Sequence, residues 1–250
     1  MTSPVLLFFC LLILLWLSER LGVVLRKWRP PAEDIRHDLD VILTAALTLL
    51  GLIIGFTFSM AVTRFDLRKN FEEAEANAIG TEYLRADLLP SADEDHVRQL
   101  LRSYLDLRIR FYRAVDEREL QKNRADTLQL QTALWSAVEV PAIARPTPVV
   151  GLAVSGMNDV LNARGYTQFA WEDRIPTPAW MLLVSIGVGC SLLVGYTARR
   201  RVQQRVLSLI LPVFVAISFL LIADMESPRA GLIRVKPQNL VLLSRSLGRQ

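Results

Sequence analysis

The side chains that most often carry catalysis are sparse in this sequence and are not spaced for it. The two histidines, His37 and His96, stand far apart among charged neighbours, so a metal site built on imidazole is not expected. The sequence contains no phosphate-binding glycine loop, no paired-cysteine spacing and no nucleophile elbow. We therefore expect no catalytic residue, no metal site, no cofactor and no enzymatic activity.

The densest group of acids, Glu72, Glu73 and Glu75, follows two basic residues, Arg68 and Lys69. Carboxylates at this spacing could bind a cation. On a helix they also compensate basic side chains one turn earlier. The pattern favours a solvated helix start over a cation site.

The elements that would position any site are largely hydrophobic. Apolar residues make up 52% of the chain and are concentrated in four segments with almost no charge: Pro4–Leu17, Val41–Val62, Pro178–Ala198 and Val206–Ala223. Three of them have the roughly 20 residues that cross a bilayer. The first can extend to Leu25 if Glu19 and Arg20 snorkel at the interface. It has no basic region before it and no small-residue cleavage site after it, which favours an anchor over a signal peptide.

Charge indicates a lipid surface as the partner and argues against nucleic acid. The net charge is +4, and the basic residues flank the apolar segments without forming a separate patch. The two cysteines, Cys10 and Cys190, both fall inside expected spans. Basic residues in the loops at 26–40 and 199–205 place these loops in the cytoplasm and the N-terminus outside. The basic residues after the second span favour the opposite orientation, so the orientation stays open.

The polar segment between the second and third spans is expected to be a bundle of antiparallel helices. Helix propensity is high and no strand-like alternation appears. The expected helix boundaries are an end at Pro90, a start at Ser91 with Glu94 at capping-box spacing, a cap at Asp126, a cap at Thr147 and a stop at Gly165.

The predicted protein is therefore all-α, a multi-pass protein of the cell membrane with four transmembrane helices and one helical extramembrane domain. Its expected parts are a first transmembrane helix (1–25), a basic loop (26–40), a second transmembrane helix (41–63), the helical domain (64–177), a third transmembrane helix (178–198), a basic turn (199–205), a fourth transmembrane helix (206–223) and a C-terminal tail (224–250).

Small residues recur every four positions in two of the spans. Stripes of this kind let another helix approach the backbone closely. They consist of Gly51, Gly55 and Ser59 in the second span and Gly187, Ser191 and Gly195 in the third. No ionisable residue stands in the middle of a span, which argues against a proton relay. Pro212 in the fourth span serves packing or gating.

Three long motifs resemble one family. They are "GFTFSMAVTRFDLRKNFEEAEANAIGTEYLRADLLP" (55–90), "MNDVLNARG" (157–165) and "DMESPRAGLIRV" (224–235). Together they are similar to the uncharacterised bacterial membrane proteins that have a bestrophin-like domain. The motif residues singled out by this resemblance are Glu75, Asn77, Gly80, Arg85, Asp87, Asn158, Asp224, Pro228 and Gly231.

A shorter stretch resembles bestrophins proper, which are pentameric anion channels. The similar part is Gly55-Phe56 followed by Val62-Thr63-Arg64-Phe65. The resemblance implies a homo-oligomer that conducts chloride or another small anion, with Thr48, Leu52 and Phe56 lining the pore. Arg64, Arg68 and Lys69 would then concentrate anions at the pore mouth. "DMESPR" lacks the acidic cluster of the animal calcium site, and the resemblance places the helical domain in the cytosol, against the loop charges.

Two functions of different class follow. One is an oligomeric ion channel whose second span lines the pore. The other is a non-conducting membrane scaffold or sensor whose helical domain binds a partner. The tail is expected to fold back on the helical domain and then to lie in the membrane interface as an amphipathic segment or to fray.

Overall fold

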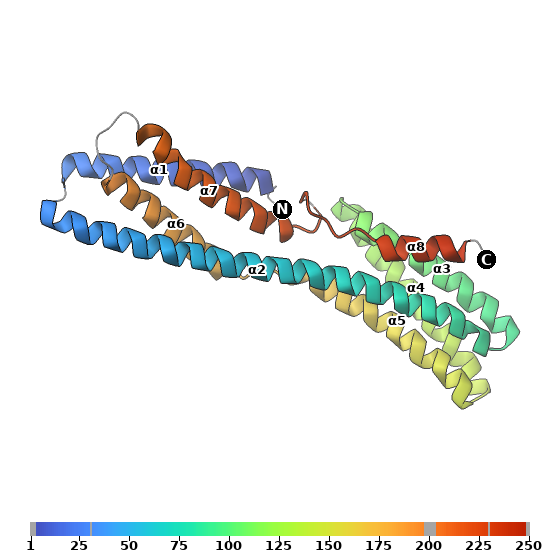
Figure 1. The fold of residues 1–250 in the computed structure, drawn as a ribbon. Helices are drawn as coiled ribbons and strands as arrows, with labels where there is room; N and C mark the ends of the chain where they lie inside the picture. Colours follow the sequence, from blue (N-terminus) through green and yellow to red (C-terminus); the bar gives the residue numbers. More distant parts are fainter. Residues whose placement is uncertain (1–3, 31, 198–203, 230, 249–250) are drawn as a thin grey trace. The chain divides into compact units, whose positions relative to one another are not determined.

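The structure is a computed structural model that describes residues 4–30, 32–197, 204–229 and 231–248 (Figure 1). These residues form helices and no strand, which confirms the all-α prediction. The helices are α1 (Pro4–Trp28), α2 (Glu33–Arg85), the short 3-10 helix η1 (Ala86–Leu88), α3 (Ser91–Arg113), α4 (Glu117–Ala144), α5 (Pro148–Glu172), α6 (Thr177–Thr197), α7 (Gln204–Met225) and α8 (Gln238–Leu247). Most of the basic turn expected at 199–205 lies outside the described residues.

The chain divides into two compact units. The first, here called the membrane unit, comprises Met1–Thr63 and Arg174–Ile233, and the second, the helical domain, comprises Arg64–Asp173 and Arg234–Gln250. Among the described residues, three helical stretches are long and apolar enough to cross a membrane: Pro4–Trp28, Ile35–Leu88 and Pro148–Thr197. The apolar part of α7, Leu209–Met225, is shorter. A fourth span therefore stays a prediction.

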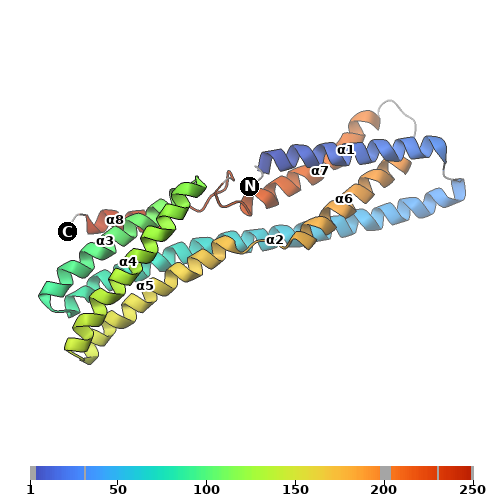
Figure 2. The same cartoon turned by 180° about the vertical axis from the view of Figure 1, so that it is seen from behind.

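The membrane unit packs α1, α6, α7 and the first half of α2 around one apolar cluster (Figure 2). α1 contacts both α6 and α7, and Leu15, Leu50, Leu183 and Phe219 are each 2% exposed or less. Such burial of large side chains stabilises a helix bundle through close packing.

Helices α1 and α6 approach each other at their glycines. A Cβ at Gly195 would overlap the carbonyl oxygen of Glu19, and a Cβ at Gly22 would overlap that of Leu192. The Ser18 hydroxyl adds a hydrogen bond of 2.8 Å to the carbonyl oxygen of Val188. Glu19 is itself only 3% exposed, so it does not snorkel as expected but is buried in the bundle. The helix continues past it to Trp28.

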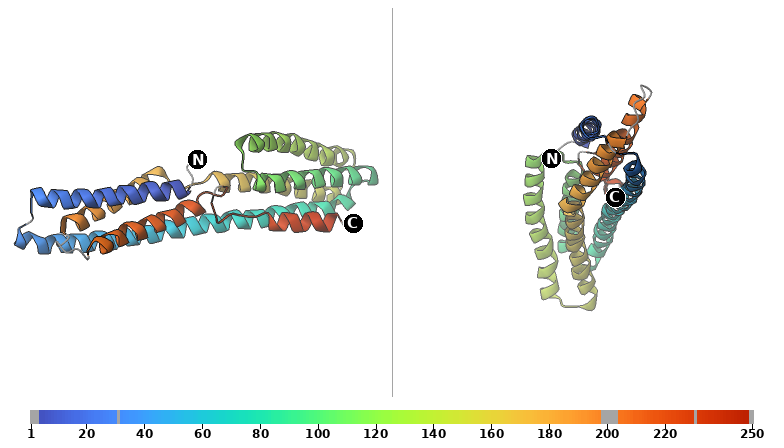
Figure 3. Two further views of the ribbon diagram at one scale, coloured as in Figure 1. Left: turned by 90° about the horizontal axis from the view of Figure 1, so that it is seen from above. Right: turned by 90° about the vertical axis from the view of Figure 1, so that its left-hand side faces the viewer.

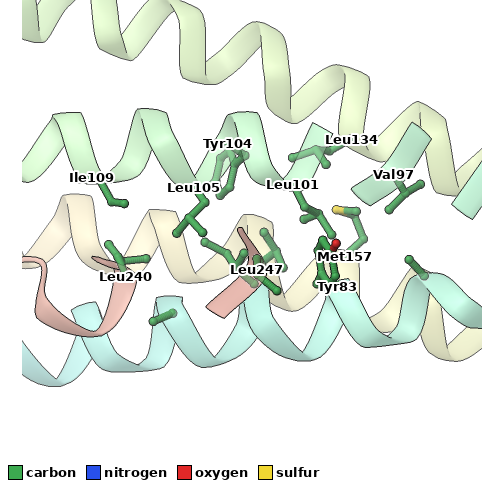
Figure 4. Packing of buried hydrophobic residues seen from close by; sticks show 14 of the residues in the cluster. Tyr83, Val97, Leu101, Tyr104, Leu105, Ile109, Leu134, Met157, Leu240 and Leu247 are labelled. Atoms are coloured by element: carbon green, nitrogen blue, oxygen red, sulfur yellow. The ribbon is translucent and has the colours of Figure 1, made fainter. Parts of the chain in front are cut away.

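The helical domain has a separate core, formed by α3, α4, α5, α8 and the second half of α2 (Figure 4). The face of α3 that carries Leu101, Tyr104 and Leu105 is fully buried, as the spacing predicts. Met157 of α5, Leu134 of α4, and Leu240 and Leu247 of α8 complete the same cluster.

Several helix ends differ from expectation. Helix α3 does begin at Ser91, but Pro90 is its N-cap, so Ser91 is not in the position to form a capping box. Glu94 pairs with Arg98. Helix α4 begins at Glu117, nine residues before Asp126, and Asp116 caps it. Thr147 caps α5 as predicted, whereas Gly165 does not stop it. The basic loop expected at 26–40 is short, since α1 ends at Trp28 and α2 begins at Glu33.

The tail helix α8 packs on the helical domain, so the expectation that it lies in the membrane interface is wrong. Helix α8 lies beside α2 and α3 (Figure 3). Its apolar side chains pack against the core there, and Leu243 approaches Gly80. The carboxylate of Glu72 on α2 accepts hydrogen bonds from the backbone N–H of Leu240 at 3.0 Å and the side chain of Asn239 at 2.8 Å. Glu72 therefore supplies the N-terminal cap that α8 lacks in its own sequence.

The α1–α6 contact predicts opposite effects for two glycines of one helix. Gly195→Ala should lower the melting temperature in detergent, because the new methyl group cannot fit against Glu19. Gly189→Ala should leave it unchanged or raise it, since the position is open and alanine favours a helix by about 0.5–1 kcal/mol. Equal melting temperatures of the two variants would contradict the tight crossing.

The Glu72 cap predicts that α8 can be released by one substitution. Glu72→Ala leaves buried N–H groups without an acceptor, at a cost of about 1–3 kcal/mol. Trypsin should then cut at Arg245 faster than in the wild type, as read by mass spectrometry. Glu73→Ala, at an exposed neighbouring position, is the control. If both variants resist trypsin as the wild type does, Glu72 does not hold the tail.

Candidate functional site

One face of the first half of α2 is left uncovered by the other described helices of the membrane unit. Leu52 is 54% exposed and Phe56 is 64% exposed, and Thr48 one turn earlier is exposed as well. The opposite side of the same helix, at Leu50 and Thr57, is buried. The three pore-lining candidates thus share a face that points away from the protomer's own bundle; whether this face lines a pore stays a prediction.

The two stripes of small residues have different environments. Around Gly51 and Gly55 no described atom lies within 4 Å of where a Cβ would be, and Ser59 is exposed. On α6, by contrast, Ser191 and Gly195 are buried, and Gly187 faces the Leu15 side chain. A packing role for the α2 stripe therefore requires a contact outside the protomer and stays a prediction.

Two of the three pore-mouth candidates are occupied by contacts within the helical domain. Arg68 is fully buried, and its guanidinium donates to the carbonyl oxygens of Ala170 at 2.8 Å and Asp173 at 3.1 Å, at the end of α5. A cation is favourable at a helix C-terminus. Arg64 pairs with the Asp173 carboxylate at 2.9 Å. Lys69 alone of the three is exposed.

Two of the three acids expected to be solvated, Glu72 and Glu75, are in fact buried, whereas Glu73 is exposed. Glu75 is fully buried and forms a two-point ion pair with Arg108 of α3, and its Oε2 also accepts from the Thr167 hydroxyl at 3.2 Å. Burial, and next the charge of Glu75, raise the pKa of Tyr104 and of Tyr112. An ion pair so deep loses its hydration, so removing either partner is strongly destabilising. Sequence reasoning missed this network because a charged helix face usually indicates solvent.

The remaining motif residues near α2 contact neighbouring helices or are exposed to solvent. Gly80 and Asn77 line the surface that receives α8. Asp87 pairs with Arg98. Arg85 reaches the carbonyl oxygen of Leu152 at 3.4 Å, and Asn158 is exposed.

The motif after α7 forms a turn. The Asp224 carboxylate accepts from the backbone N–H groups of Leu232 at 2.7 Å and Ile233 at 2.8 Å. Pro228 is buried in this turn. A Cβ at Gly231 would lie 2.5 Å from the carbonyl oxygen of Asp224, so only glycine fits. The motif thus fixes where the chain leaves α7.

Metal ligands do not gather anywhere in the described part of the chain. No group of three or more His, Cys, Asp or Glu side chains there could hold a metal ion. His37 and His96 are both exposed.

One further acid of α2, Glu82, is buried without a hydrogen-bond partner for either carboxylate oxygen among the described residues. Gly156 of α5 makes room for it, since a Cβ there would overlap Oε2. Burial raises the pKa of Glu82 to about 8, against a smaller lowering by Arg85 and with a further increase from Asp159. The side chain is therefore held as a neutral acid near neutral pH.

This raised pKa predicts a pH dependence of stability. The unfolded chain loses the Glu82 proton near pH 4.5, and the folded protein keeps it up to about pH 8. The contribution of Glu82 is full below the lower value and is lost as the pH rises toward the higher one. Glu82→Gln, which keeps the neutral form, should flatten the fall in melting temperature over this range. The exposed Glu73→Gln should not, and a parallel fall in both variants would contradict the assignment.

Comparison with known proteins identifies the family to which this chain is similar. A model of the family described as bestrophin-like domain matches residues 6–240. Among curated proteins, no sequence match to the chain is found.

Solved structures share the fold at low sequence identity. A crystal structure of a bacterial bestrophin homologue from Klebsiella pneumoniae with a tryptophan-to-alanine mutation is 14% identical, with a TM-score of 0.67 over 100% of this chain and 97% of that one. The structure of a bestrophin homologue from the same organism solved by zinc phasing is 15% identical, with a TM-score of 0.64 over 96% of each chain. These matches span almost the full length of both chains, and the family match covers most of the sequence. The chain therefore belongs to the bestrophin-like domain family.

Proposed function

We propose that this protein is an oligomeric ion channel in which the uncovered face of α2 lines the pore. The observation that supports it is the exposure of Leu52 and Phe56, which lie one helical turn apart on the side of α2 away from the protomer's own helices. Around the axis of an oligomer, such residues form successive apolar rings. A ring of this kind blocks ions by excluding water.

The composition of this face differs from that of a face that meets only lipid. The exposed side of α1 carries large apolar residues, among them Leu6, Phe9 and Ile13. The exposed side of α2 carries large apolar residues as well, among them Leu49, Leu52, Phe56, Phe58 and Met60, but mixes them with glycines and hydroxyl residues. Lipid contact needs no such small or polar positions, whereas an oligomer axis uses both.

Two hydroxyl groups on this face, those of Thr48 and Thr63, already donate their hydrogen within α2. Thr48 donates to the carbonyl oxygen of Thr44 at 2.9 Å, and Thr63 donates to that of Ser59 at 2.9 Å. Because these two donors are already used, they offer no hydrogen to an anion, and we assign the control of passage to the apolar side chains. The proposed constriction therefore works by dewetting, without coordination of the ion.

The charges near the end of this face could set whether cations or anions pass. Arg68 is buried and Arg64 is paired, which leaves Lys69 beside the exposed acids Asp66 and Glu73. The preference for chloride or another small anion is thus carried by the resemblance to bestrophins and not by an excess of exposed cations. The reversal potential of reconstituted protein under a salt gradient reads the sign of the ion directly.

The second function is a non-conducting scaffold or sensor. The open backbone at Gly51 and Gly55 favours it, because a helix of another chain could pack closely there. In that case Leu52 and Phe56 are contacts between chains, and the protein conducts nothing.

A flux assay in liposomes separates the two functions. If the α2 face lines a pore, Leu52→Ala/Phe56→Ala widens and wets the constriction, and ion flux should rise several-fold over the wild type. If the face is a packed interface, the double variant should lose its oligomer, since removing a buried phenylalanine costs roughly 3–5 kcal/mol in protein cores.

Leu6→Ala/Phe9→Ala is the matched control, because these side chains on α1 are 54% and 53% exposed. It should leave flux unchanged. A stable oligomer that passes no ions in either the wild type or the Leu52→Ala/Phe56→Ala form would end the channel proposal.

A further inference from the structure

A groove of about 630 Å³ lies on the helical domain between the end of α3 and the tail. Tyr112 and Arg113 contribute from α3, the segment 234–238 forms the next wall, and Arg245 comes from α8. The volume lies within the roughly 300–1,000 Å³ of small-molecule sites. It is far larger than a single monatomic ion requires.

The charge of this groove is of one sign. Its lining includes Arg113, Arg234, Lys236 and Arg245 and no acidic side chain. Arg113, Lys236 and Arg245 are exposed and form no ion pair within the described part of the chain. Elsewhere on the same domain basic side chains do find acids, as Arg98 does with Asp87 and Glu94. Exposed cations such as Arg113, Lys236 and Arg245, with no ion-pair partner among the described residues, raise the local positive potential and attract anions.

We propose that this groove binds a phosphate-bearing ligand. Guanidinium groups match the geometry of phosphate oxygens, and several cations around one cavity suit a group with several charged oxygens. The buried Val235 and Pro237 and the partly buried Val241 form an apolar wall beside them. That wall accommodates the part of the ligand that carries no charge.

The site consists of side chains and does not use the N-terminus of α8. That N-terminus is already capped by Glu72, which accepts from Leu240 and Asn239. The groove exists only while α8 is docked, because the tail forms one of its walls. Binding should therefore stabilise the docked tail by mass action. This proposal concerns a ligand of the helical domain and does not depend on ion conduction.

Full-length protein in phosphatidylcholine nanodiscs is titrated calorimetrically with inorganic pyrophosphate. We expect binding that weakens as ionic strength rises. In Lys236→Gln/Arg245→Gln the affinity should fall by about tenfold or more, because two charged contacts are lost. The control with the same charge change is Arg118→Gln/Lys122→Gln, at exposed positions of α4 outside the groove, and it should bind as the wild type does.

A second arm distinguishes a soluble ligand from a lipid headgroup. Phosphatidylglycerol is added to the nanodiscs, and the melting temperature is measured without pyrophosphate. A rise in the wild type and the control, but not in the groove variant, assigns the site to a lipid headgroup; pyrophosphate binding without that rise assigns it to a soluble phosphate compound.

Three results would overturn the proposal. The first is that the wild type responds to neither probe. The second is that the groove variant retains wild-type responses to both. The third is that the α4 control loses as much as the groove variant, because this would show a general effect of net charge.

Discussion

The helical domain depends on one buried line of residues along α2 in which most members are ionisable. Each residue of this line is 1% exposed or less: Arg68, Glu72, Glu75, Ile79 and Glu82 of α2, followed by Ala86 at the start of η1. Arg68 binds the end of α5, Glu72 caps α8, and Glu75 pairs with Arg108 of α3. Each buried charge is costly to desolvate, so it is tolerated only where its own partner is in place. The positions of three helices are thereby specified from a single one.

The spacing of this line also determines which side of α2 is free. Its members follow one another at intervals of three and four, and the earlier buried residues Leu50, Thr57 and Ala61 keep the same phase. The chemistry of the line changes from apolar to ionisable after Ala61, whereas its side of the helix does not. Thr48, Leu52 and Phe56 are left on the opposite side, so the exposed candidate face and the buried charges are two consequences of one periodicity.

Much of the fold could be predicted from sequence because it follows from apolar length and helix propensity. The all-α class, the start of α3 at Ser91 and the Thr147 cap were predicted in this way. What could not be predicted depends on partners distant in the chain. The acids of α2 have the spacing of a solvated helix, and only Arg108, Thr167 and α8 make their burial possible. The glycine stripes of α2 and α6 likewise look alike in the sequence, although the one on α6 is packed against other helices and the one on α2 is open.

The residues of the family motifs mainly determine architecture. Glu75 pairs with Arg108 of α3, and Gly80 leaves room for Leu243 of α8. Asp224 and Gly231 fix the turn that follows α7. The candidate pore residues Thr48 and Leu52 lie before the first motif begins, and only Phe56 falls inside it. A match that rests on such motifs therefore transfers the scaffold more securely than the activity, because function resides in sites that one fold can vary. For this chain the scaffold sets the direction of the α2 face, and the proposed channel function rests on the side chains of that face.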